Sequence, residues 1–200
     1  MRIEEYYDRM ILTLREKYCQ EQEERTEGDA TESGTKTFWG DAFSMMFPKD
    51  WTDMSALEIS AGYRIYSGAR TILKAPDAEA VLVLSRLPGN EEEADADREP
   101  PAELPALWEM IRENMKKLYR QNVFYDNGTV SAGERPVFWQ DMKAFCLSGS
   151  IYCLIFLFET GNERISGNFH CDFNKYVKWR PTILKMLSTI QVQDGRQKAE

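Results

Sequence analysis

The chain has 200 residues, with 25 basic and 33 acidic side chains, a formal charge of −8 and a pI of about 4.9. This acidity argues against nucleic acid or an anionic membrane as the main partner, because either would favour a basic face. Hydrophobic residues make up 42% of the chain, which is typical of a globular protein that buries a substantial core.

The N-terminus, MRIEEYYDRMILTLREKY, carries charges throughout and lacks an uninterrupted apolar run, so it predicts no signal peptide. The longest apolar run, residues 151–158, is too short to span a bilayer. The four cysteines include no CxxC pair and are too irregularly spaced for a disulfide framework. We therefore expect a cytoplasmic protein with reduced thiols.

Residues 3–25 predict an amphipathic helix, because apolar residues recur at helical spacing (Ile3, Tyr6, Met10, Leu14 and Tyr18). This helix could pack on the main domain, mediate a homo-oligomer with a second copy, or move freely. The expected organisation is an N-terminal helix over 1–27, a polar linker over 28–35, a main domain over 36–192 and a polar tail over 193–200.

Strand patterns dominate the first half of the main domain. KTFWGDAFSMMFP (36–48) predicts two short strands about a Gly40-Asp41 turn. Residues 51–66 are predicted to be partly helical, and 71–74 and 78–87 are predicted strands on either side of a Pro-Asp turn. The segment 89–103 is acidic and holds two consecutive prolines, so we expect a mobile loop there.

The second half begins with a predicted helix over 103–121, whose apolar stripe is expected to be Leu107, Met110, Ile111, Met115 and Leu118. Residues 123–173 predict four consecutive antiparallel strands with tight turns at Asn127-Gly128, Gly149-Ser150 and Gly161-Asn162. A last helix is expected over about 176–190. This order predicts an α+β fold with an antiparallel β-sheet of about six to seven strands and helices on both faces.

The main domain resembles the Mog1/PsbP-like family, in particular its small bacterial members. The resemblance rests on the order of the elements and on three segments, FSMMFPKDW (43–51), APDAEAVLVLSRL (75–87) and FHCDFNKYVKWRPTILKMLSTI (169–190). It covers residues 36–192 and leaves the N-terminal helix outside. It implies an αβα sandwich and a binding or assembly role rather than catalysis.

Candidate metal ligands come from the expected strand register. The predicted turns place Cys146 opposite Cys153 and Cys153 opposite His170, with Asp172 one step along the same face. Cysteine and histidine are the ligands that zinc prefers. Core packing is the favoured alternative for two reasons. Side chains in a row across a flat sheet point apart instead of toward one metal ion, and the neighbouring positions on this face are apolar: Met142, Ala144, Ile155 and Leu157. We expect no bound metal and no cofactor.

The opposite face of the same strands holds a second set of candidates, Trp139, Asp141 and Lys143. A charged pair among aromatic residues could mark an interaction surface. The alternative is that these residues lie where the covering helix ends.

Motifs of catalytic chemistry are absent from the sequence, which has no P-loop, GxGxxG, HExxH or GxSxG and only one histidine. We therefore predict no catalytic residues and a non-enzymatic, cytoplasmic protein-interaction module with an unidentified protein partner, and neither nucleic acid nor membrane as a partner. One alternative is an immunity or accessory protein for a toxin or secretion system. Another is a small-molecule-binding protein or a hydrolase.

Overall fold

A computed structural model of the chain describes residues 32–62, 70–87, 103–133, 135–147, 149–161 and 163–193. Its elements, in chain order, are β1 (Ser33–Phe38), β2 (Phe43–Pro48), β3 (Thr52–Asp53), α2 (Ala56–Gly62), β4 (Arg70–Lys74), η1 (Pro76–Ala78), β5 (Ala80–Leu87), α3 (Leu104–Leu118), β6 (Val123–Ala132), β7 (Arg135–Cys146), β8 (Gly149–Thr160), β9 (Glu163–Asp172), η2 (Phe173–Lys175), α4 (Tyr176–Ser188) and β10 (Gln191–Val192). The predicted N-terminal helix, most of the acidic loop and the tail after residue 193 lie outside the described residues.

The described strands form two antiparallel sheets. The larger has seven strands in the order β3-β4-β5-β9-β8-β7-β6, and the smaller has three in the order β1-β2-β10. An antiparallel sheet of about six to seven strands was predicted, and so was the four-strand meander β6–β9. The separate small sheet was not predicted, and because β1 begins at Ser33 it also takes in the last residues of the expected linker.

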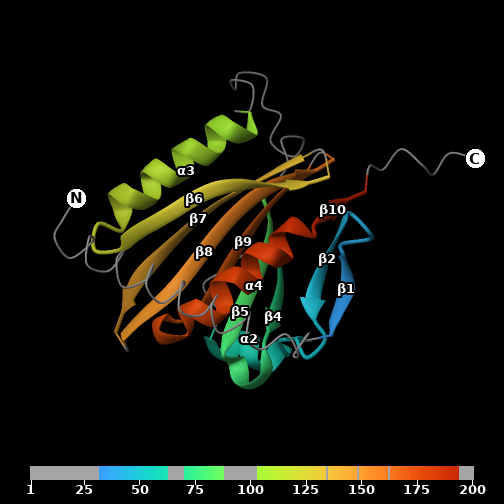
Figure 1. Ribbon diagram of the computed structural model, residues 1–200, viewed down its shortest axis with the longest axis horizontal. Helices are drawn as coiled ribbons and strands as arrows, with labels where there is room; N and C mark the ends of the chain where they lie inside the picture. Colours follow the sequence, from blue (N-terminus) through green and yellow to red (C-terminus); the bar gives the residue numbers. More distant parts are fainter. Residues whose placement is uncertain are drawn as a thin grey trace, which may run out of the picture.

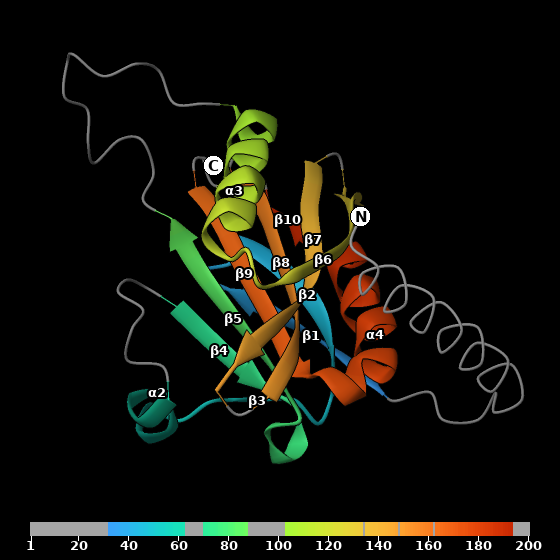
Figure 2. The same cartoon turned by 90° about the vertical axis from the view of Figure 1, so that its left-hand side faces the viewer.

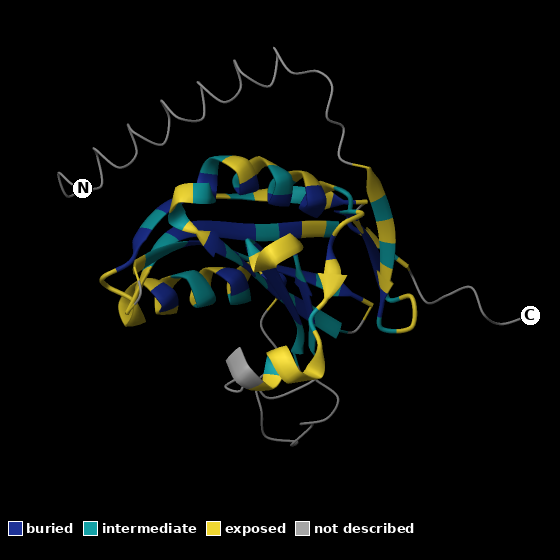
Figure 3. Cartoon of the chain, turned by 90° about the horizontal axis from the view of Figure 1, so that it is seen from below, coloured by how far each residue is buried: buried dark blue, intermediate teal, exposed yellow. Residues whose placement is uncertain are grey.

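Helices cover both faces of the large sheet, as expected (Figures 1 and 2). On one face Trp108 and Met115 of α3 pack on β7 and β8, and Ile59 of α2 packs on β4 and β5. The other face is covered by α4 and by the small sheet. Buried positions lie on the sides of these layers that face one another (Figure 3).

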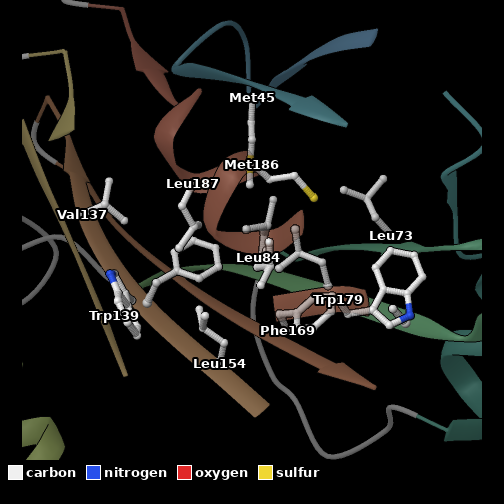
Figure 4. Packing of buried hydrophobic residues seen from close by; sticks show 14 of the residues in the cluster. Met45, Leu73, Leu84, Val137, Trp139, Leu154, Phe169, Trp179, Met186 and Leu187 are labelled. Carbon is white, nitrogen blue, oxygen red and sulfur yellow. The ribbon is translucent and has the colours of Figure 1, made fainter. Parts of the chain in front are cut away.

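The main core fills the space between the large sheet, α4 and β2 (Figure 4). Met45 of β2 and Met186 and Leu187 of α4 meet there, and all three side chains are buried. At one end of this core Trp51 packs edge-on against Trp179, with 5.7 Å between ring centroids. Because alternate residues of β8 and β9 enter this core, the two strands hold α4 in place.

Two of the three predicted meander turns are wrong. The Gly161-Asn162 turn is confirmed, since Thr160 pairs with Glu163. The β7–β8 turn lies between Cys146 and Gly149 instead of at 149–150, because these two residues pair. The β6–β7 turn lies between Ala132 and Arg135, which pair with each other.

Asn127-Gly128, the expected first turn, lies inside β6. Gly128 is opposite Trp139, and a Cβ built on it would lie 2.9 Å from an atom of the indole ring. The glycine therefore makes room for a cross-strand tryptophan, a use that the Asn-Gly signal does not distinguish from a turn.

The buried face of α3 is also rotated from its predicted stripe. Leu104, Trp108 and Met115 are buried, whereas Met110 and Leu118 are exposed. Trp108 is the largest side chain on α3, and its burial against the sheet determines which face of the helix packs there.

Candidate functional site

The predicted metal ligands are only partly brought together. Cys153 lies opposite His170, as expected. Cys146 does not lie opposite Cys153, because it pairs with Gly149 at the exposed end of β7. Asp172 lies opposite Ile151 and is exposed. Within the described ranges, no three His, Cys, Asp or Glu residues form a group that could hold a metal ion.

Cys153 has the surroundings of a core residue. It packs with Met115 and Met142 under α3, and burial raises the pKa of its thiol to about 12. Such a thiol is protonated at neutral pH and is a poor nucleophile and a poor metal ligand. Cys171 points to the opposite face with Phe169, under α4, and burial likewise raises its pKa to about 12.

Replacing His170 by glutamine should change the free energy of unfolding by about 1 kcal/mol or less at neutral pH. Burial lowers the pKa of His170, so its folded state disfavours the charged imidazole. The unfolded chain therefore binds more protons below the usual histidine pKa, and the wild type loses stability as pH falls through that range. Denaturation at pH 7 and pH 5 should show a smaller acid loss for His170→Gln. One tightly bound zinc per chain in elemental analysis would contradict this reading.

The second candidate set, Trp139, Asp141 and Lys143, lies on the α4 face of β7. The side chain of Asp141 is fully buried and accepts a hydrogen bond from Arg180 Nε at 2.8 Å. It also accepts one from the backbone N–H of Asp126 at 2.7 Å and one from the Tyr152 hydroxyl at 3.2 Å. Asp141 is thus a buried carboxylate with three donors.

Arg180, which the sequence analysis did not single out, completes this cluster. Its guanidinium also donates to Asp126 at 3.0 Å and lies 5.8 Å from the centre of the Trp139 ring. Burial raises the pKa of Asp141, and the Arg180 hydrogen bond and charge act in the opposite direction. The available signal was an aspartate on a largely apolar strand face, because such a carboxylate needs a cation from the covering helix.

The cluster therefore fastens α4 to the large sheet. Trp139 and Asp141 are buried in contacts within the fold, so a partner cannot reach them. Only Lys143 of the predicted set is partly exposed. The Lys143 ammonium lies 4.5 Å from the Phe173 ring and 5.3 Å from the Phe145 ring. A partner contact at this set stays a prediction, and it rests on Lys143.

Exposed apolar side chains lie where α3 and β7 end, and the Lys143 ammonium is close to the ring of one of them, Phe145. Leu118 and Tyr119, at the end of α3, are 73% and 47% exposed, and Phe145, at the end of β7, is 48% exposed. Leu147, in the β7–β8 turn, is fully exposed. We call these four residues the end patch.

Asn122 joins the two halves of the end patch. Its backbone N–H donates to the carbonyl of Tyr119 at 3.0 Å, and its side-chain oxygen accepts from the backbone N–H of Phe145 at 3.3 Å. Asn122 is itself buried, so the end of α3 and the end of β7 are held together.

Basic residues adjoin the end patch: Lys116, Lys117 and Arg120 flank Leu118 and Tyr119 in the sequence, and Lys143 lies beside Phe145. This contrasts with the acidity of the whole chain. The described ranges hold 16 basic and 15 acidic residues, whereas the remaining segments hold 9 basic and 18 acidic ones. The negative charge of the protein therefore lies outside the described residues, chiefly in 1–31 and 88–102.

Comparison with solved structures agrees with this architecture. The cyanobacterial PsbP protein of Synechocystis superposes with a TM-score of 0.57 at 8% identity, covering 84% of this chain and 96% of its own. The chain has a Mog1/PsbP-like fold. The Ran-binding protein Mog1p of Saccharomyces cerevisiae gives a TM-score of 0.51 at 10% identity, covering 82% of this chain and 97% of its own.

Protein PA94 of Pseudomonas aeruginosa shares the Mog1/PsbP-like fold with a TM-score of 0.51 at 10% identity, covering 82% of this chain and 99% of its own. No protein-family model matches the sequence, and no curated protein is similar to it in sequence. None of the helices in the described ranges is both long enough and apolar enough to cross a membrane.

Proposed function

We propose that this Mog1/PsbP-like chain is a non-enzymatic protein-interaction module that binds a protein partner through the end patch. The observation that carries the proposal is the exposure of Leu118, Tyr119, Phe145 and Leu147 at the ends of α3 and β7, which Asn122 joins. Single exposed apolar residues are ordinary on protein surfaces, but a group of them is typical of an interaction site. Covering one fully exposed leucine side chain contributes roughly 1.5–3 kcal/mol.

The fold and the chemistry of the buried cysteines support binding over catalysis. Mog1p, which has the same fold, is named for binding the protein Ran. The likeness is one of fold alone, so Ran itself is not carried over to this chain. Cys153 and Cys171 are buried, and the raised pKa of each thiol keeps it protonated, which disfavours a nucleophilic role for these two cysteines.

Affinity capture from the native host, followed by mass spectrometry, tests the proposal. The full chain should retain a specific protein, and Leu118→Ser with Leu147→Ser should reduce its recovery by about tenfold or more, because the apolar contact is lost. Leu57→Ser is the matched control, since Leu57 is 79% exposed on α2 and lies outside the end patch.

Equal recovery by the end-patch variant and the wild type would contradict the proposed surface. Equal loss by Leu57→Ser would show that the effect is not specific to the end patch. Melting temperatures of all the variants should stay close to that of the wild type, because the replaced side chains are exposed.

A further inference from the structure

We infer that residues 3–25 of the same chain dock on the end patch and must be displaced by the partner. The docking surface is the one through which the proposed function binds a partner. Only the displacement of residues 3–25 by that partner rests on the proposed function. The docking itself involves this chain alone. It is carried by the chemistry of the two surfaces and by the place where residues 1–31 join the fold.

The two surfaces are complementary in polarity and in charge. Residues 3–25 have an apolar stripe at helical spacing, and residues 1–31 contain nine acidic and five basic side chains. The end patch presents apolar side chains bordered by Lys116, Lys117, Arg120 and Lys143. An acidic amphipathic helix can therefore place its stripe on the end patch and its carboxylates beside the basic border.

Residues 1–31 join the fold at the same end of the large sheet as the end patch. β1 begins opposite Pro48, whose carbonyl accepts a hydrogen bond from Trp51, and β3 follows at once. A single row of paired residues then crosses the sheet from β3 to β7: Thr52, Lys74, Val81, His170, Cys153 and Met142. Phe145 lies three residues beyond Met142, so the end patch and the start of β1 share one end of the strands.

Residues 3–32 are long enough to extend from the start of β1 to the end patch. Five steps between neighbouring strands span about 24 Å. A helix over residues 3–25 would be about 35 Å long, and the seven residues 26–32 can extend over about 23–25 Å. Tethering also gives the segment a high effective concentration at the patch, which favours the same chain over a second copy.

Hydrogen–deuterium exchange of the full chain tests the docking without any partner. A helix of this length is marginal by itself in water, so sustained protection of amides 3–25 requires docking. We expect protection in the wild type and exchange faster by about tenfold or more in Leu118→Ser with Leu147→Ser. Leu57→Ser should keep the protection, and amides of β8 and β9 should be unchanged in all variants.

Charge reversal gives a second, independent variant. Lys117→Glu with Arg120→Glu should also speed exchange of amides 3–25, and 1 M salt should reduce the difference from the wild type, because salt screens exposed charges. Glu113→Lys, on the same helix as Lys117, should not speed it.

Three results would overturn the inference. These are absence of protection in the wild type, unchanged protection in the end-patch variant, and protection that grows with protein concentration, which would assign the patch to a second copy. Protection that appears only with phosphatidylserine vesicles would assign it to a lipid surface and would also overturn the inference. Failure here leaves the capture experiment unaffected, whereas failure of capture alone would reject the proposed function and leave the docking intact.

Discussion

Replacing Arg180 by methionine is expected to lower the free energy of unfolding by about 3–5 kcal/mol, measured by chemical denaturation. The reason is the position of Asp141, whose side chain is fully buried and is 2.8 Å from Arg180 Nε. Without the guanidinium the carboxylate stays in the core with no cation beside it, and desolvation of an uncompensated charge is strongly destabilising.

Two further variants separate the ion pair from the packing of the arginine. Asp141→Asn with Arg180→Met should recover much of the loss, because it removes both charges together. Lys185→Met is the matched control, since Lys185 is an exposed residue on the same helix and its loss should change stability by about 0.5 kcal/mol or less. A loss for Arg180→Met as small as that of the control would contradict the role of the pair.

The pH dependence gives a signature that a packing defect would not show. Burial raises the folded-state pKa of Asp141, and removing Arg180 removes the main opposing influence. Above the usual aspartate pKa the folded variant then binds more protons than the unfolded chain, so its stability falls as pH rises through the raised pKa. The deficit of Arg180→Met should therefore be larger at pH 7 than at pH 5. Parallel profiles for variant and wild type would contradict this explanation.

The faces of the meander were predictable from the sequence, but its turns were not. Alternation along β7, β8 and β9 separates the residues under α3 from those under α4, and the structure confirms that separation. The expected β7–β8 pairing places Cys146 opposite Cys153, whereas the observed pairing places it opposite Gly149, a shift of four residues. An even shift keeps every side chain on its face, so hydrophobic patterning does not distinguish the two registers.

The candidate site was only partly visible for a related reason. The sequence drew attention to Asp141 on a largely apolar strand face, yet its partner Arg180 lies 39 residues away on α4. Leu118 fitted the apolar stripe of the predicted helix, but the covering of Trp108 rotates the helix and leaves Leu118 exposed. Both features depend on how a helix docks on the sheet, which local periodicity does not determine.

Replacing Gly167 by alanine is the second change with a large expected effect, a loss of about 3 kcal/mol, at the upper end of what overpacking usually costs. Gly167 lies in β9, paired with Phe156 on one side and with Leu84 on the other. A Cβ at this position would lie 1.9 Å from Cζ of Phe156, which is fully buried. Because the ring is enclosed by the main core, it has no free space into which to move.

Thermal unfolding should show this loss as a fall in melting temperature of about 6–12 °C. Gly34→Ala is the matched control, since a Cβ there would meet only Lys49 Cγ at 3.7 Å, an ordinary contact. That change should be neutral or slightly stabilising, because alanine reduces the entropy of the unfolded chain. Phe156→Leu should restore part of the stability of Gly167→Ala by shortening the side chain that the new methyl group meets. If the melting temperature of Gly167→Ala equals that of the wild type, the close approach of β9 to the Phe156 ring is not a feature of the folded protein.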